Sequence, residues 1–596
     1  MPPRTVQPHG WVALRLPNGN LRVLQITPNT FVPTPLLSSF QILDVQLTFA
    51  IVEASTISLG KYGSFPSNLL IERPLHLTFE IQEKRDGETL SRLRVVPGTE
   101  LNADILAETD VNDEAADGTS DTAIVADEGE ELTLVDDTGK VVARSNREII
   151  DDSARQTLTS EEIDELKKKG ASAGKELIAK LMLSHTAIDQ KTSYSLAKYK
   201  LLKERKFLRR FTVLPLDVPL LGQWLLEDRD AGKVLELRAE MLGLLGCWAD
   251  VHFGGRPEQG VDEPHGGRWL AVDDTGGLLV AAMAERMGIL HHEKEEENPI
   301  GDATNQVQAV TETMAKEESA EQQQQQQTQL PANHDRKRPR RDDLDDHYSL
   351  INTITLIHAN SQPNLSVLRY FDFDATDPNP LRPYHPLFTS LLPISWLQLV
   401  SPQDDVVYTD NPLEVSPEEL ASWKPSRRGN YHRKRRRWAR TQEIVTATRA
   451  GGFSGLAVAS TMEPISVLRH ALPLLAGGSP IAIYSPTVEP LEQLIDCFSI
   501  ARRAAWASTP PAEVEGKSQT ELDHWQGNDD FPINPTLVLG ASVQSSRARR
   551  WQVLPGRTHP FMTGRGGAEG YLFTGWRTLP AEGKISARGK FHKKRK

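Results

Sequence analysis

Val272-Asp273-Asp274-Thr275-Gly276-Gly277-Leu278-Leu279 joins two apolar segments of different lengths. Trp269–Val272 has the length of a short buried strand, and Leu278–Met287 has the length of a helix. In a doubly wound α/β sheet, a glycine turn between such segments lets the backbone approach a cofactor, and the next helix points its N-terminus at the anionic group. The stretch therefore predicts a strand–turn–helix junction of an α/β domain.

This turn keeps only one of the three glycines in a methyltransferase nucleotide loop, which reads roughly D/E-x-G-x-G-x-G. With Asp273 at the acidic position, the glycine positions hold Thr275, Gly277 and Leu279. Threonine resists the positive φ that glycine adopts readily, and leucine places a bulky side chain where a ligand would lie. The junction is therefore either an ordinary tight turn, which is the commoner case, or part of a sheet that has lost its cofactor.

From Phe211 onward, strand and helix patterns alternate, which indicates a parallel sheet with helices on both faces. At the end of the strand Gly455–Ala459, a methyltransferase acting on a base nitrogen usually carries an acidic or amide group. Glu463 is the only carboxylate nearby, and its place at a helix start explains it equally well. The other expected strands are Ile351–Ile357, Val367–Phe373, Ile481–Tyr484, Thr536–Leu539, Trp551–Leu554 and Tyr571–Thr574, and the other expected helices are Gly232–Leu245, Pro464–Leu475 and Val488–Ala505.

Residues 1–157 are expected to form an N-terminal β-barrel domain. Short apolar and β-branched runs divided by Pro and Gly clusters are typical of a small antiparallel barrel or sandwich. An acidic stretch at about 98–139 is expected to be a disordered insertion in this domain, because a strand pattern resumes at Val141–Ile150. The earlier expected strands are Trp11–Leu16, Leu21–Ile26, Gln41–Ile51 and His76–Ile81.

Residues 158–212 are expected to form a helical basic linker. A Thr or Ser cap followed by Glu161 and Glu162 marks its first helix start. Its last helix, about Ser195–Arg210, alternates apolar residues with lysines and arginines. Such a helix buries one stripe and presents a dense cationic face.

The charge of the chain is segregated along its 596 residues. Fourteen Asp and Glu and no Lys or Arg lie between Glu100 and Gly139, and without them the net charge of -12 becomes +2. Acidic blocks beside basic blocks are common in proteins that meet nucleic acid, although single charge runs are often solvated faces. The remaining predicted units are a degenerate Rossmann-like methyltransferase domain at 213–290 and 348–580, a low-complexity insertion at 291–347, and a basic tail at 581–596.

Several other classes of function lack their sequence signals. The two cysteines, Cys247 and Cys497, exclude a disulfide scaffold and a multi-thiolate metal cluster. No Ser-His-Asp order, metal-spaced His/Cys set or P-loop is present, and His291-His292 is more typical of a solvated pair than of a metal site. No stretch approaches the roughly 20 apolar residues of a membrane span. The low cysteine count also suggests a reducing compartment.

Four groups of short strings, in order along the chain, resemble the non-catalytic subunit of the eukaryotic nuclear tRNA adenine N1-methyltransferase. The resemblance runs across nearly the whole chain apart from the two low-complexity insertions. The strings are Gly60–Asn68; Asn146–Asp152 followed by Gln156–Thr159; Lys191-Thr192 with Lys198-Tyr199; and Trp551–Pro560 with Gly566-Gly567 and Gly570-Tyr571.

This resemblance implies a catalytically inert subunit with an α+β N-terminal part followed by an α/β, Rossmann-like part. It implies that S-adenosylmethionine is bound by a catalytic partner of similar fold, with none in this chain, and that two copies of each subunit form a heterotetramer. It further implies tRNA as the ligand, with the T-loop adenine as the methylated base, no membrane partner, and a nuclear location. Arg336–Arg341 and Lys593–Lys596 are compatible with nuclear import.

The residues expected to bind RNA follow from positive charge together with their position in the family. Lys and Arg supply charge-assisted donors to phosphates and release counterions. A solvated helix face at Lys198–Lys206 and a flexible loop at Arg433–Arg437 are the alternative interpretations. The expected contacts are Asn146, Arg147, Lys198, Lys200, Lys203, Arg205, Lys206, Arg229, Lys233, Arg433, Lys434, Arg435 and Arg549, with no catalytic, cofactor-binding or metal residue.

Two other functions stay open at this point. The chain could itself be a methyltransferase with a divergent loop, against which Thr275 and Leu279 argue. It could also be a translation-initiation accessory protein that bridges RNA and protein factors. Methylation by the isolated chain would favour the first, and ribosomal factors as sole partners would favour the second.

Overall fold

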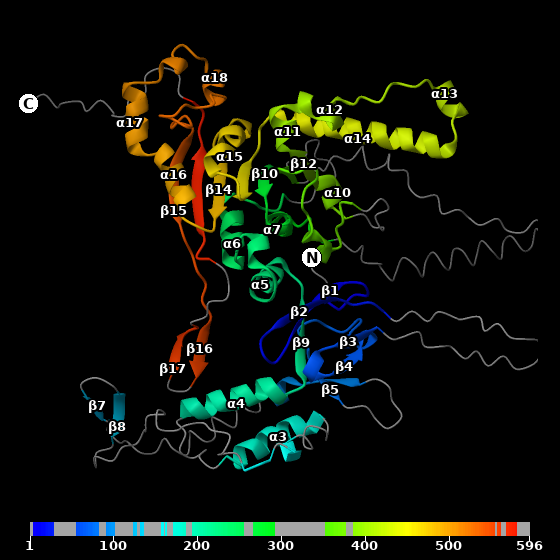
Figure 1. The fold of residues 1–596 in the computed structure, drawn as a ribbon, viewed down its shortest axis with the longest axis vertical. Helices are drawn as coiled ribbons and strands as arrows, with labels where there is room; N and C mark the ends of the chain where they lie inside the picture. The colour runs from blue at the N-terminus through cyan, green and yellow to red at the C-terminus, as the bar shows by residue number, and fades with distance from the viewer. Residues whose placement is uncertain are drawn as a thin grey trace, which may run out of the picture.

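The computed structural model contains an antiparallel β domain, a pair of helices and a larger α/β domain (Figure 1). The predicted contacts Asn146 and Arg147, the expected strands Gln41–Ile51 and Val141–Ile150, and the basic tail lie outside the described residues. The structure describes residues 4–28, 55–82, 91–101, 123–127, 131–135, 157–159, 161–163, 171–185, 193–254, 266–291, 352–376, 385–554, 557–561 and 568–580.

A seven-stranded sheet forms the centre of the α/β domain, in the order β12-β11-β10-β13-β14-β18-β15. The first five strands in this order are parallel to one another, and β18 is antiparallel to both of its neighbours. The predicted α/β class is confirmed. The strands are β10 (Arg268–Asp273), β11 (Thr353–His358), β12 (Leu391–Ser395), β13 (Gly455–Ala459), β14 (Pro480–Ser485), β15 (Val538–Gln544) and β18 (Tyr571–Arg577).

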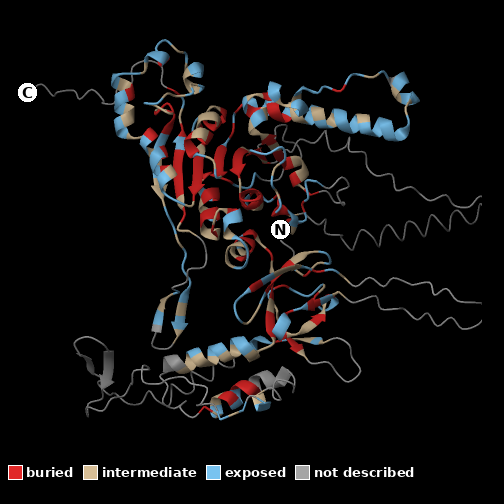
Figure 2. Ribbon diagram, in the orientation of Figure 1, coloured by how far each residue is buried: buried red, intermediate tan, exposed pale blue. Residues whose placement is uncertain are grey.

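Helices cover both faces of this sheet, as in a doubly wound fold. Alternate residues of β10 show this directly: Trp269 and Ala271 belong to one apolar core, while Leu270 and Val272 belong to the other. The first core contains α5 (Val218–Asp228), α6 (Ala239–Trp248) and α7 (Leu278–Met287), and the second contains α11 (Trp396–Val400), α14 (Pro425–Arg449), α15 (Pro464–Ala471) and α16 (Glu489–Cys497). The buried sheet between these layers is visible in Figure 2.

Three local predictions for this domain are wrong. Val367–Phe373 is not a strand but contains the 3-10 helix η7 (Leu368–Phe371). The predicted helix Gly232–Leu245 is divided into η6 (Ala231–Val234) and α6, because Leu235 and Glu236 between them have positive φ. The predicted helix Val488–Ala505 is two helices, since Ser499 caps a new one, α17 (Ile500–Ser508).

The remaining short elements connect the sheet to its outer helices. Residues 405–449, which end with α14, form an arm that projects from the domain (Figure 1). These elements are α10 (Leu387–Ser390), η8 (Pro402–Asp404), α12 (Val406–Thr409), α13 (Pro417–Ser422), η9 (Leu472–Leu474), η10 (Ala512–Val514) and α18 (Gln519–Asp523).

The N-terminal domain is an open antiparallel sheet in the order β2-β1-β9-β5-β6. A barrel requires its edge strands to pair, and across the described residues β2 and β6 do not. The predicted barrel is therefore corrected to a sheet that packs against a small β3–β4 hairpin through Phe65, Phe79 and Phe211. The strands are β1 (Trp11–Arg15), β2 (Leu21–Gln25), β3 (Thr56–Ser58), β4 (Ser64–Pro66), β5 (Thr78–Gln82), β6 (Arg92–Val95) and β9 (Arg210–Pro215), with η1 (Gly60–Tyr62) and η2 (Ser67–Leu69) beside them.

Strand β9 changes the predicted boundaries of the N-terminal domain. It pairs with β1 and β5, so the boundary predicted between residues 212 and 213 divides a strand of this sheet. On its other side, Leu214 joins Ala13 in the core of the α/β domain. The ring of Trp11 also meets that of Tyr370, with centroids 4.8 Å apart.

The acidic stretch at about 98–139 is not uniformly without structure, contrary to the prediction. Ala123–Asp127 (β7) and Glu131–Val135 (β8) form an antiparallel pair, because apolar and β-branched residues alternate there among the acidic ones. At the start of the stretch, Glu100 forms ion pairs with Arg94 and Arg210. The charge of the stretch obscured this local pattern.

The helical linker contains α3 (Ala171–Leu183) and α4 (Ser193–Phe207), which pack together. Helix α4 also contacts strand β16, in a hairpin of β16 (Trp551–Leu554) and β17 (Arg557–Pro560). Trp551–Leu554 is therefore a strand, as predicted, but it lies outside the central sheet (Figure 1). Within the described residues, every helix is too short or too polar to cross a lipid bilayer.

Candidate nucleic-acid interface and the closed end of the sheet

The glycine turn lies where the strand order reverses, between β10 and β13. Gly276 and Gly277 have φ values of 74° and 94°, which only glycine adopts without cost. The predicted strand–turn–helix junction is confirmed, with β10 ending at Asp273 and α7 beginning at Leu278. In open α/β sheets, this reversal point is where ligands bind.

Side chains of the turn itself accept hydrogen bonds from N–H groups at the start of α7. The buried carboxylate of Asp273 accepts hydrogen bonds from the Thr275 N–H at 2.6 Å, the Thr275 hydroxyl at 2.5 Å and the Val280 N–H at 3.0 Å. The Thr275 hydroxyl oxygen accepts a further bond from the Leu279 N–H at 3.2 Å. Two N–H groups of this helix N-terminus that could bind an anionic ligand, those of Leu279 and Val280, are thus satisfied internally.

Asp274 bridges the ends of the two neighbouring strands. Its carboxylate accepts hydrogen bonds from the Thr461 N–H at 3.0 Å, the Thr461 hydroxyl at 3.2 Å and the Ser460 hydroxyl. Ser460 and Thr461 directly follow β13. This bridge crosses the crevice in which a doubly wound fold holds its ligand.

Apolar residues fill the space around the turn. Leu278 and Leu279 are fully buried. A side-chain carbon added to Gly277 would lie 3.3 Å from the Cα of Leu365 and 3.4 Å from Leu368. The segment that follows β11 therefore packs directly against the backbone of Gly277.

The ends of β11 and β13 also lack the carboxylates of a nucleotide site. Strand β11 ends in His358, where a dinucleotide-binding fold has an acidic residue for the ribose hydroxyls. The His358 ring is buried, and its Nδ1 lies 2.7 Å from the carbonyl oxygen of Asn360. Glu463 is exposed and precedes α15 without a side-chain capping bond. These residues do not fit S-adenosylmethionine.

The cationic face predicted on α4 exists as a helix beside the hairpin. Lys198, Arg205 and Lys206 are exposed, and Lys200 and Lys203 are half-buried. Two of these ammonium groups lie over aromatic rings of the same helix: Lys203 over Tyr199 at 4.6 Å, and Lys206 over Phe207 at 5.3 Å. The Tyr62 hydroxyl donates a hydrogen bond to the Arg205 carbonyl oxygen at 2.9 Å, which ties α4 to the N-terminal domain.

Arg229, Lys233 and Arg549 are all exposed; Lys233 lies in η6, Arg229 follows α5 and Arg549 precedes the hairpin. The Arg229 guanidinium lies over the Trp224 ring at 4.7 Å, and Lys233 is 3.9 Å from Asp230. Arg550, next to Arg549, pairs with Glu227 of α5 at 3.5 Å. The three predicted residues therefore belong to one region, although they come from distant parts of the chain.

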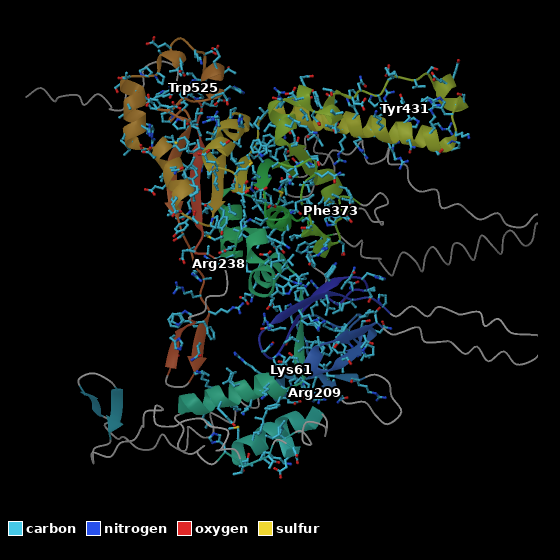
Figure 3. The ribbon with its side chains drawn as sticks, in the orientation of Figure 1. Lys61, Arg209, Arg238, Phe373, Tyr431 and Trp525 are labelled. Atoms are coloured by element: carbon cyan, nitrogen blue, oxygen red, sulfur yellow. The ribbon has the colours of Figure 1, made fainter. Side chains whose placement is uncertain are left out.

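Arg238 is a positioning residue of this region that the sequence did not indicate. Its buried guanidinium donates hydrogen bonds to the carbonyl oxygens of Ser546 at 2.7 Å, Glu569 at 2.6 Å and Ala568 (Figure 3). These carbonyls flank the hairpin on both of its connections to the central sheet. A lone arginine before a helix carries no local signal for such a role.

Arg433, Lys434 and Arg435 lie on α14, so the alternative of a flexible loop is wrong. A 25-residue helix forms here because its second half is anchored by buried Ile444 and Val445. Lys434 pairs with Asp410 at 2.6 Å, and Arg435 pairs with Glu414 at 2.7 Å. The arm and α4 lie at opposite ends of the molecule (Figure 1). The structure thus does not bring all the predicted contacts together.

The fold and these sites define a class: a doubly wound α/β protein whose ligand crevice is closed by its own side chains and whose surface carries separate cationic helices. The chain belongs to the Gcd10p family, whose model matches residues 42–424.

Curated relatives match the chain over nearly its full length. Proteins of Aspergillus oryzae and Aspergillus fumigatus are each 42% identical over 99% of this chain and 95% of their own length. A protein of Schizosaccharomyces pombe is 24% identical over 99% of this chain and 96% of its own. All three are named tRNA (adenine(58)-N(1))-methyltransferase non-catalytic subunit trm6.

Two solved structures align with lower similarity. An S-adenosylmethionine-dependent O-methyltransferase of Thermotoga maritima aligns over 97% of both chains, with 8% identity and a TM-score of 0.35. A tRNA (m1A58) methyltransferase of Aquifex aeolicus aligns over 62% of this chain and 79% of its own, with 10% identity and a TM-score of 0.28. The fold class of this chain rests on its sheet topology.

Proposed function

We propose that this chain is the non-catalytic subunit of a tRNA (adenine(58)-N(1))-methyltransferase, required by a catalytic partner for tRNA N1-methyladenosine formation. The observation that carries the proposal is 42% identity, over 99% of the chain, to relatives of that name. The closed crevice supports a non-catalytic role. Where a methyl donor would bind, backbone N–H groups are already bonded to Asp273, and Leu278 and Leu279 are buried.

The methyl donor then belongs to the partner. S-adenosylmethionine supplies the methyl group in that subunit, and this chain contributes binding and positioning. A degenerate Rossmann-like methyltransferase fold in this chain is compatible with a partner of similar fold. We propose an assembly of two copies of each subunit.

In this chain, RNA binding is the function of its cationic surface. The target adenine lies within the folded tRNA, so the enzyme must hold the RNA by shape and backbone while the base is exposed. The cations of α4 together with Arg229, Lys233 and Arg549 supply donors for phosphates on one side of the molecule. A nuclear location fits this role, and the basic clusters Arg336–Arg341 and Lys593–Lys596 support it.

Reconstitution tests the proposal. The chain, a co-expressed catalytic partner, and the complex of both are each given tRNA and S-adenosylmethionine, and N1-methyladenosine is measured by mass spectrometry. Efficient methylation by the complex alone is expected. Methylation by the isolated chain would instead identify a divergent methyltransferase. A complex that forms without any effect on methylation would favour the translation-initiation role and overturn the proposal.

A further inference from the structure

The cations of α14 are divided between two faces of the helix. Tyr431, Lys434, Trp438 and Gln442 recur at spacings of three and four residues, and all of them contact the segment before the helix. Trp438 and Gln442 both donate hydrogen bonds to the carbonyl oxygen of Tyr408, at 3.0 and 2.7 Å. This inner face fixes the helix in the arm.

The opposite face carries Arg433, Arg437 and Arg440. These residues have the same helical spacing of three and four, and all three side chains are exposed. None of them forms an ion pair with another residue that the structure describes. Arg440 donates a hydrogen bond to the carbonyl oxygen of Phe388 at 2.8 Å, and Arg433 bonds only to neighbours within its own helix. Across the part of the chain that the structure describes, their charges are therefore not paired with a carboxylate.

We propose that this outer face of α14, formed by Arg433, Arg437 and Arg440, binds the sugar–phosphate backbone of RNA. The inference deepens the proposed function and rests on it, since it takes tRNA as the RNA. It adds a second contact surface, on the arm, far from the cations of α4 (Figure 1). Helix α14 begins at Pro425, just beyond the residues 42–424 that the family model matches.

Three features favour phosphates over a protein partner. The cations of the outer face are arginines, whose planar guanidinium binds phosphate through two parallel hydrogen bonds. The first acidic residue of the helix is Glu443, so Arg433–Arg440 carries no negative side chain over about 10 Å at 1.5 Å per residue. A protein interface needs apolar anchors, and among the described residues no large exposed apolar side chain lies on α14.

The arm is also anchored before any ligand binds. Ile444, Val445 and Thr448 are buried against the α/β domain, and the Tyr431 hydroxyl donates to the Leu413 carbonyl oxygen at 3.1 Å (Figure 3). The outer arginines thus project from a helix that need not be ordered on binding, which reduces the entropic cost of association.

The test compares two variants of the complex with its catalytic partner. In the first, Arg433, Arg437 and Arg440 are replaced by Gln. Binding of fluorescein-labelled tRNA is measured by anisotropy across a range of salt concentrations. The expected result is roughly tenfold weaker binding at about 0.1 M salt, with the slope of log affinity against log salt reduced by about two to three, one for each lost phosphate contact.

The control variant carries D410N, K434Q, E414Q and R435Q together. It removes Lys434 and Arg435, two cations already paired with carboxylates, without changing the net charge. Because these pairs neutralise both cations, the tRNA affinity and salt slope are expected to match those of the unmodified complex, contrary to the sequence-based expectation that Lys434 and Arg435 contact RNA. In methylation assays the outer-face variant should raise KM for tRNA and leave kcat unchanged.

Unchanged affinity and slope in the outer-face variant would overturn the inference. So would equal losses in both variants, because the effect would then come from the helix as a whole. Either result is distinct from failure of the proposed function, in which the unmodified complex would not methylate tRNA at all.

Discussion

The carboxylate of Asp273, the last residue of β10, accepts a hydrogen bond from the N–H of Val280 at 3.0 Å, in the first turn of α7. A side chain of the protein thus occupies the position at a helix N-terminus where other doubly wound proteins hold an anionic ligand. Burial raises the pKa of this carboxyl, since it disfavours the charged form. The turn is therefore a structural element of the α/β core.

Replacing Asp273 with Asn should destabilise the α/β domain by about 1–3 kcal/mol, because an amide offers one acceptor where three donors converge and leaves a buried N–H unsatisfied. Urea unfolding followed by tryptophan fluorescence measures this, since Trp269 is buried in the same strand. Asp529→Asn, at an exposed position, is the control and should change little. Equal stability of the D273N protein and the unmodified chain would contradict the capping role.

His358 should make stability depend on pH. Burial lowers its pKa below the ordinary value of 6.5, so between these two values the unfolded chain binds more protons than the folded one. Stability therefore falls as the pH decreases through this window. In His358→Gln, the decrease in Tm from about pH 7.5 to about pH 5.5 should be smaller than in the unmodified chain. The exposed His432→Gln control should retain the full decrease, and a decrease of equal size in both variants would argue against this prediction.

Arg238 should control the order of the β16–β17 hairpin. Replacing it with Met removes the hydrogen bonds to Ser546, Ala568 and Glu569. Hydrogen exchange at residues 546–554 should then become faster by about tenfold, while exchange in the parallel strands stays unchanged.

Arg547→Met is the matched control for that experiment. Arg547 is partly exposed and pairs with Glu569 at 3.0 Å, and such pairs contribute only about 0–1 kcal/mol. Its effect on hairpin exchange should be small. If hairpin exchange became faster by the same factor in both variants, the effect would come from the loss of a positive charge in general and not from the hydrogen bonds of Arg238.

Reversing Lys198, Lys203 and Lys206 to Glu should weaken tRNA binding by the complex and reduce its salt slope by about two to three. The same three positions changed to Arg should retain binding, because phosphate accepts hydrogen bonds from either cation. Fluorescence anisotropy at several salt concentrations measures both. An unchanged slope in the Glu variant would show that α4 does not face the RNA.

The sequence alone could predict the parts of the site that depend on neighbouring residues, and not those that depend on residues far apart in the chain. The strand–turn–helix at Asp273–Leu278 was predictable, since a buried strand, two glycines and an apolar helix are all local signals. The cationic character of α4 was equally local. The bridge from Asp274 to Thr461 was not predictable, because it depends on two segments 187 residues apart meeting at neighbouring strand ends.

The chain sequence determined most of the helices and strands of the α/β domain, where positive charge gathers, and that the glycine turn departs from a nucleotide loop. Only the tertiary structure decided that β9 joins the N-terminal sheet, that β18 lies between β14 and β15, and that Arg238 binds both connections of the hairpin. It also decided that Lys434 faces Asp410 while Arg437 faces outward. The physical reason is that periodicity and capping report the local backbone, whereas strand order and ion pairing depend on contacts between segments far apart in the chain.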